Sequence, residues 1–62
     1  MKLKVEIEMD NAAFSENGSG TEVARILQAL AKKVDGQDLD ESFGTRLMDV
    51  NGNKVGTADV EA

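Results

Sequence analysis

Apolar and charged residues alternate strictly at the start of the chain. Over residues 2–9, apolar side chains recur at every second position, which is the period of a β-strand with one buried face. The pattern therefore predicts a half-buried strand over these residues. Its inner face is Leu3, Val5, Ile7 and Met9, and its outer face is Lys2, Lys4, Glu6 and Glu8.

The spacing of apolar residues then changes from two to three and four. Residues 10–20 are rich in turn-forming residues and predict a loop, anchored to the core by Phe14. The following spacing is typical of an amphipathic helix, and it predicts one helix over about residues 21–35. The apolar positions of this helix are Val23, Ile26, Leu27, Leu30 and Val34.

The pair Asn51-Gly52 is the most specific local signal in the sequence. Asn-Gly favours a two-residue hairpin turn in which both residues have positive φ. The alternating segments on either side predict two antiparallel strands over roughly 43–50 and 53–61.

A two-residue turn determines which residues of the hairpin face each other. Leu47 is then opposite Gly56 on the inner face, and Met48 is opposite Val55 on the outer face. We expect Gly56 to lie under the helix and to allow the helix to approach the sheet.

Charge places the first strand in the sheet. If it runs antiparallel to the last strand, Lys2 lies opposite Glu61 and Lys4 lies opposite Asp59, which favours the pairing. A parallel arrangement beside the middle strand would instead bring Lys4 near Arg46. The sequence thus predicts a single domain over residues 1–62 of the α+β class. The expected fold is β-α-β-β, a three-stranded antiparallel sheet of order 1-3-2 with one helix packed on one face.

Composition excludes several classes of function. The chain has 12 acidic and 7 basic residues, a net charge of −5, and no His, Cys, Trp or Tyr. An acidic surface without aromatic stacking residues disfavours direct nucleic-acid binding. Without His or Cys there is no triad base for a serine nucleophile and no thiolate metal site. We therefore predict no enzymatic activity, no catalytic residues, no cofactor and no metal.

The first residues do not form a signal peptide, and no apolar stretch is long enough to span a membrane. The sequence therefore predicts a cytoplasmic protein that does not bind membranes.

Two loops have partial ligand-binding patterns. Asp49, Asn51 and Asn53 are spaced like the start of a calcium loop, but Lys54 and Val60 occupy the places of its essential Gly and Glu. The hairpin explains these residues better. Residues 18–21, Gly-Ser-Gly-Thr, resemble an anion-binding turn without the Lys of a P-loop, so a flexible loop with a helix cap is the better interpretation.

Two surfaces are candidates for protein contacts. One helix covers one face of the sheet, so Met48, Val50 and Val55 are predicted to form an apolar patch on the uncovered face, where a homodimer could form. Arg25, Lys32 and Lys33 give the exterior of the helix a cationic strip, which is either a site for an acidic partner or simply a solvated face. Residues 35–41 are acidic; they could bind a cation or imitate phosphates, although such connectors usually serve solubility.

Three blocks together resemble a group of very small, uncharacterised proteins encoded by tailed bacteriophages and prophages. The blocks are residues 11–14 (Asn-Ala-Ala-Phe), 22–27 (Glu-Val-Ala-Arg-Ile-Leu) and the hairpin segment 47–56. The resemblance implies a phage-related origin and a host-cytoplasm setting, and it carries no catalytic or ligand residues.

These observations together favour a non-enzymatic phage or prophage accessory protein that acts as a small protein–protein interaction module with an unknown partner. The alternative is an acidic nucleic-acid mimic that occupies a host DNA-binding protein.

Overall fold

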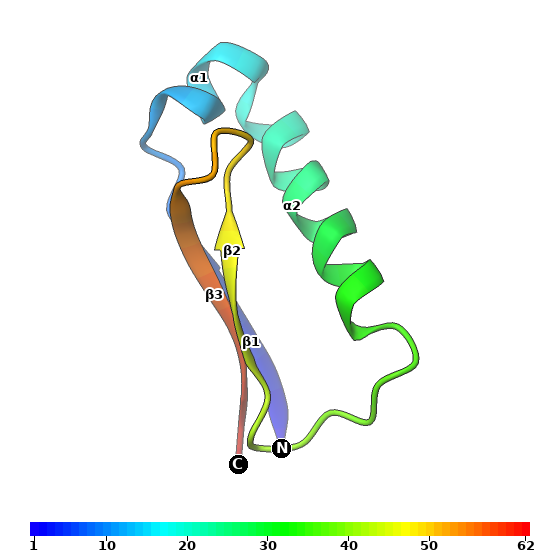
Figure 1. The fold of residues 1–62 in the computed structure, drawn as a ribbon. Coiled ribbons are helices and arrows are strands. Elements are labelled where there is room, and N and C mark those ends of the chain that lie inside the picture. The colour runs from blue at the N-terminus through cyan, green and yellow to red at the C-terminus, as the bar shows by residue number, and fades with distance from the viewer.

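The computed structural model describes all 62 residues and contains one three-stranded sheet and two helices. The strand order is β1-β3-β2 and both pairings are antiparallel, so the predicted topology is confirmed. In Figure 1, α2 runs along one face of the sheet, and both termini lie at the end opposite the hairpin turn and α1. The elements are β1 (Lys2–Ile7), α1 (Ala12–Asn17), α2 (Ser19–Val34), β2 (Gly44–Met48) and β3 (Lys54–Glu61).

The predicted pairing of β1 with β3 is confirmed residue by residue. Lys2 pairs with Glu61, and Lys4 pairs with Asp59, on the outer face. Opposite charges that face each other across a ladder stabilise this register. A slip of one residue would also turn the apolar face of β1 toward solvent. The strand itself ends at Ile7 rather than at residue 9.

The segment predicted as a loop over residues 10–20 contains the short helix α1. Asn11 caps it, with the side-chain oxygen Oδ1 accepting a hydrogen bond from the backbone N–H of Ala13 at 3.1 Å. A six-residue helix has no stability of its own, so its formation depends on packing rather than on propensity. Phe14 is buried, as predicted, and anchors the segment to the core.

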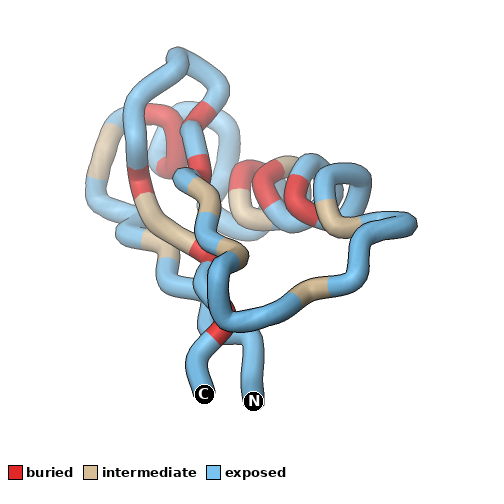
Figure 2. Tube along the Cα trace, turned by 60° about the horizontal axis from the view of Figure 1, so that its bottom comes forward, coloured by how far each residue is buried: buried red, intermediate tan, exposed pale blue.

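The core lies between the helices and the hairpin. Figure 2 shows buried positions gathered where α1 and α2 face β2 and β3, whereas the chain near the termini is mostly exposed. The helix predicted over 21–35 is confirmed and begins slightly earlier. The buried cluster consists of Ala13, Phe14, Ile26, Leu30, Leu47, Val55 and Ala58.

The hairpin turn differs from the two-residue turn predicted at Asn51-Gly52. Only Gly52 has positive φ, at 84°, and Asn51 does not. The N–H of Asp49 donates to the carbonyl of Asn53 at 2.8 Å, and the N–H of Gly52 donates to the carbonyl of Asp49 at 3.0 Å. This is a three-residue loop in which a left-handed Gly follows the turn, another common way to close a hairpin.

The longer loop shifts the register next to it. Leu47 pairs with Gly56 as predicted, but Met48 pairs with Lys54, so Val55 is an additional residue in a β-bulge. The predicted pairing of Met48 with Val55 is therefore wrong. The bulge turns Val55 into the core, where it is 7% exposed.

Gly56 is a position of close approach, but the neighbour is not the helix. A Cβ atom at Gly56 would lie 1.9 Å from the carbonyl oxygen of Glu6 and 3.0 Å from the Cα of Ile7. The expectation that Gly56 lets the helix approach is therefore wrong, because the close neighbour is the backbone of β1.

Candidate functional site

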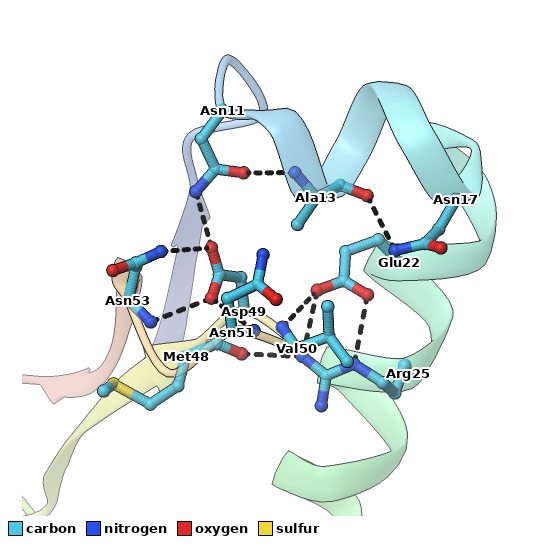
Figure 3. A network of polar contacts seen from close by, with 10 residues as sticks. All are labelled: Asn11, Ala13, Asn17, Glu22, Arg25, Met48, Asp49, Val50, Asn51 and Asn53. Carbon is cyan, nitrogen blue, oxygen red and sulfur yellow. Dashed lines mark hydrogen bonds and ion pairs between the residues drawn. The ribbon is translucent and has the colours of Figure 1, made fainter.

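Two carboxylates are buried where the hairpin turn meets the helices. Glu22 is 2% exposed and Asp49 is 4% exposed. A buried charge destabilises a protein unless hydrogen bonds or an opposite charge replace the water it loses. Figure 3 shows that the partners of these two acids come from α2, from the N-cap of α1 and from the turn.

Asp49 holds the turn in shape. Its Oδ1 accepts the backbone N–H groups of Asn51 at 2.9 Å and Asn53 at 2.8 Å. Its Oδ2 accepts the side-chain amides of Asn11 at 2.7 Å and Asn53 at 3.2 Å. The backbone N–H of Asn53, together with these other donors, holds the pKa of Asp49 below its ordinary value. Because Asn11 also caps α1, Asp49 connects the turn to that helix.

Glu22 connects α2 to the turn. The Nε and Nη2 atoms of Arg25 donate to its two oxygens, each at 3.1 Å, and the N–H of Val50 donates to Oε2 at 2.8 Å. Arg25 Nη2 also donates to the carbonyl of Met48 at 2.8 Å. The hydrogen bond from Arg25 is the main reason that the pKa of Glu22 is lowered.

This arrangement braces the fold. No buried side-chain nitrogen or oxygen lacks a hydrogen-bond partner. A general acid needs a pKa raised toward neutrality, whereas those of Glu22 and Asp49 are lowered. Asn51 and Asn53 present N–H donors to Asp49, where a calcium loop would present oxygens to the ion.

Acid should therefore unfold the protein. Because the pKa values of Glu22 and Asp49 are lower in the folded chain, their stabilisation is complete above the unfolded values, which are about 4. It is lost as the pH falls through the folded values. We expect the melting temperature, measured by circular dichroism, to be steady between pH 7 and 5 and to fall below about pH 4. A melting temperature that rises between pH 5 and pH 3 would contradict this role of the two acids.

The structure divides the predicted apolar patch. Met48 and Val50 remain exposed, at 39% and 54%. Val55 was predicted to share this surface, but it belongs to the core because of the bulge in β3. Of the predicted patch, only Met48 and Val50, both near the turn, are therefore exposed.

The predicted cationic strip on the helix exterior is also not brought together. Lys32 and Lys33 are exposed in the last turn of α2, as expected. Arg25 instead turns toward the hairpin, where it forms an ion pair with Glu22 and binds the Met48 carbonyl. The i, i+3 pairing of Glu22 with Arg25 was expected, but its burial was not.

A groove between α2 and β2 brings some of these residues together in another way. Its volume is about 210 Å³. Lys33 lines it whereas Lys32 does not, and Arg46 of β2 adds a third cation to Arg25 and Lys33. The apolar part of the lining is Ile26, Ala29, Leu30, Leu47 and Met48.

The inner face of the sheet is less well covered than predicted. Leu3 and Val5 of β1 are 44% and 37% exposed, because α2 packs against β2 and leaves this part of β1 uncovered. Leu27, on the flank of α2 away from the groove, is also 44% exposed. The alternation in β1 correctly indicated one apolar face but could not indicate which strands the helix covers.

The acidic connector takes part in local structure at one position. Oδ1 of Asp40 accepts hydrogen bonds from the backbone N–H of Ser42 at 2.9 Å and from its hydroxyl at 2.5 Å. These bonds lower the pKa of Asp40. The remaining acids of this segment, Asp35, Asp38 and Glu41, are exposed.

Sequence reasoning missed the buried acids, although a signal for one of them was present. Glu22 lies four residues before Ile26 and eight before Leu30, so all three share the buried face of α2.

No helix combines the length and apolar character needed to cross a bilayer. Comparison of the chain with protein-family models, with curated proteins and with solved structures found no match.

Proposed function

We propose that this chain is a non-enzymatic protein–protein interaction module, and that it acts as a phage or prophage accessory protein in a host bacterial cytoplasm. The phage setting is supported by the three sequence blocks described above. The mode of action is supported by one observation. On a protein of net charge −5, the α2–β2 groove gathers three cationic side chains beside the exposed Met48.

The groove suits a partner segment that carries both acidic and apolar side chains. Lys33 and Arg46 would attract the acidic groups, and electrostatic complementarity of this kind gives specificity and speeds association. The charge of Arg25 is already paired with Glu22. Met48 offers an apolar contact at the same groove. Val50, exposed in the neighbouring turn, would extend this contact.

The backbone around Met48 and Val50 is already held in place. Arg25 binds the carbonyl of Met48, and Glu22 binds the N–H of Val50. A surface fixed before binding loses less conformational entropy when a partner docks. The buried acids therefore contribute to binding through the shape of the surface.

Two neighbouring lysines provide a matched test. Lys33→Glu and Lys32→Glu change the net charge equally, and both residues are exposed in the last turn of α2, but only Lys33 lines the groove. Tagged wild type and variants should be incubated in host lysate, and each bound protein should be quantified by mass spectrometry. We expect a partner whose recovery falls about tenfold with Lys33→Glu and with Met48→Ala, but not with Lys32→Glu.

Two results would contradict the proposal. Equal recovery of every bound protein by Lys33→Glu and Lys32→Glu would show that the groove is not the binding surface. A bound DNA-binding protein that duplex DNA displaces, and that Asp35→Asn with Asp38→Asn releases, would instead establish the nucleic-acid mimic.

A further inference from the structure

The two edges of the sheet are not equally exposed. In the order β1-β3-β2, the edge strands are β1 and β2. The β2 edge is flanked by α2, and Arg25 occupies the carbonyl of Met48 there. No helix packs against β1 in this way, so β1 is the open edge. Open edges present unpaired backbone groups and are the usual templates for pairing with another chain.

The geometry of β1 identifies which backbone groups are free. The N–H of Glu8 donates to the carbonyl of Val55 at 2.8 Å. In this register, the even-numbered residues of β1 direct their backbone N–H and C=O groups toward β3. Because inward and outward groups alternate along an antiparallel strand, the N–H and C=O of Leu3, Val5 and Ile7 point toward the open edge.

The order of charges on β1 is complementary to itself. Two lysines are followed by two glutamates at alternate positions, Lys2, Lys4, Glu6 and Glu8. When a second copy of the strand runs antiparallel with Val5 opposite Val5, each Lys2 faces Glu8 and each Lys4 faces Glu6. All four cross-strand charge pairs are then attractive.

We propose that two copies of this chain join through β1 in that register, making a symmetric dimer with a continuous six-stranded sheet. The free backbone groups match, because Leu3, Val5 and Ile7 of one copy lie opposite Ile7, Val5 and Leu3 of the other. Each of these three pairs exchanges two backbone hydrogen bonds. A two-fold axis through Val5 is the closed, self-complementary arrangement that most homodimers have.

Neighbouring registers are worse. A shift by two residues keeps the same faces of the two strands together. In one direction it places Lys4 opposite Lys4, and in the other Glu6 opposite Glu6, and such like-charge pairs destabilise the pairing. A shift by one residue would place the apolar face of one strand beside the charged face of the other. The charge order therefore selects one register.

The same register covers apolar surface that the single chain leaves exposed. Leu3 and Val5 lie on the inner face of β1 and are 44% and 37% exposed. In the dimer each would lie against apolar side chains of the second copy. This interface differs from the predicted dimer through Met48, Val50 and Val55, and it does not use the α2–β2 groove, so its failure would leave the proposed function intact.

Charge variants of β1 test the dimer and its register together. We expect sedimentation equilibrium of the wild type at high micromolar to millimolar concentration to show a mass approaching twice 6.6 kDa. Lys4→Glu and Glu6→Lys each turn two attractive pairs into repulsive ones, and each should raise the dissociation constant about tenfold or more. Lys32→Glu and Glu16→Lys make the same charge changes elsewhere and should dimerise like the wild type.

Mixing the two β1 variants is the decisive step. In a mixed pair, the two acids of the Lys4→Glu chain face the two lysines of the Glu6→Lys chain at both positions. An equimolar mixture should therefore form a one-to-one heterodimer although neither variant associates well alone. Circular dichroism of each variant confirms that it is folded.

Amide hydrogen exchange provides a readout that does not depend on variants. The N–H groups of Leu3, Val5 and Ile7 should gain protection as the protein concentration rises, whereas those of Lys4 and Glu6 should be protected throughout. A wild type that stays monomeric at millimolar concentration, a mixture that does not associate, or outward amides whose exchange is independent of concentration would overturn the proposal.

Discussion

Asp49→Asn should lower the melting temperature by about 10 °C or more, although it changes the size of the side chain very little. Oδ2 of Asp49 accepts N–H groups from Asn11 and Asn53. Either orientation of the new amide places its NH₂ group against donors, because Oδ1 also accepts two N–H groups. The substitution therefore places the new NH₂ group against N–H donors at a buried position. It also removes the negative charge that these hydrogen bonds stabilise.

The matched control is Asp38→Asn. It removes the same charge from an exposed connector residue and should leave the melting temperature within a few degrees of the wild type. Both are measured by thermal denaturation at pH 7. Equal melting temperatures for the two variants would contradict the structural role of Asp49.

Gly56→Ala should destabilise the fold by about 3 kcal/mol, the upper end for an overpacked site. The new Cβ would lie 1.9 Å from the carbonyl oxygen of Glu6, so the backbone of β1 or of β3 must move. A flexible side chain could turn away from such a contact at little cost, but a paired backbone cannot. The free energy of unfolding from urea titration measures the effect.

Gly20→Ala is the control for this substitution. Gly20 lies in α2, has no heavy atom within 4 Å of a Cβ position, and does not have positive φ. Alanine there should leave the fold at least as stable as the wild type, because it restricts the unfolded chain and meets no neighbouring atom. A Gly56→Ala variant as stable as the wild type would show that β1 and β3 do not approach as closely as described.

The topology and most of the register follow from short patterns in the sequence. Alternation locates β1, and the positions of Lys2 and Lys4 determine its pairing with Glu61 and Asp59. These features are predictable because each depends on side chains directly opposite one another, and the alternative arrangements bring like charges together. The 3.6-residue period locates α2 because it places the apolar residues of this segment on one face of a helix.

The turn was harder to predict because Asn-Gly is compatible with more than one hairpin loop. The two-residue and three-residue loops both place Gly52 at positive φ, and they differ by a single residue. What distinguishes them here is Asp49, whose carboxylate gathers the N–H groups of Asn51 and Asn53. That one-residue difference moved Val55 from the predicted surface patch into the core.

The candidate site could be predicted only in part for a related reason. The alternation of the hairpin predicted that Met48 and Val50 are exposed, the charge pattern of the helix predicted the same for Lys33, and each is exposed. The groove that gathers Lys33 with Arg46 depends on how α2 lies against β2, and no local pattern specifies that angle. The short helix α1 was missed because six residues are too few to be stable by helix propensity, so its stability comes from burial of Ala13 and Phe14.

Glu22 and Asp49 brace the fold by joining the hairpin turn to the two helices. The most direct test is an NMR titration of the side-chain carboxyl carbons of Glu22 and Asp49. We predict that both have pKa values below those of Glu and Asp in unfolded peptides. A pKa raised toward neutrality at either residue would mark a proton-transfer group and would contradict the claim.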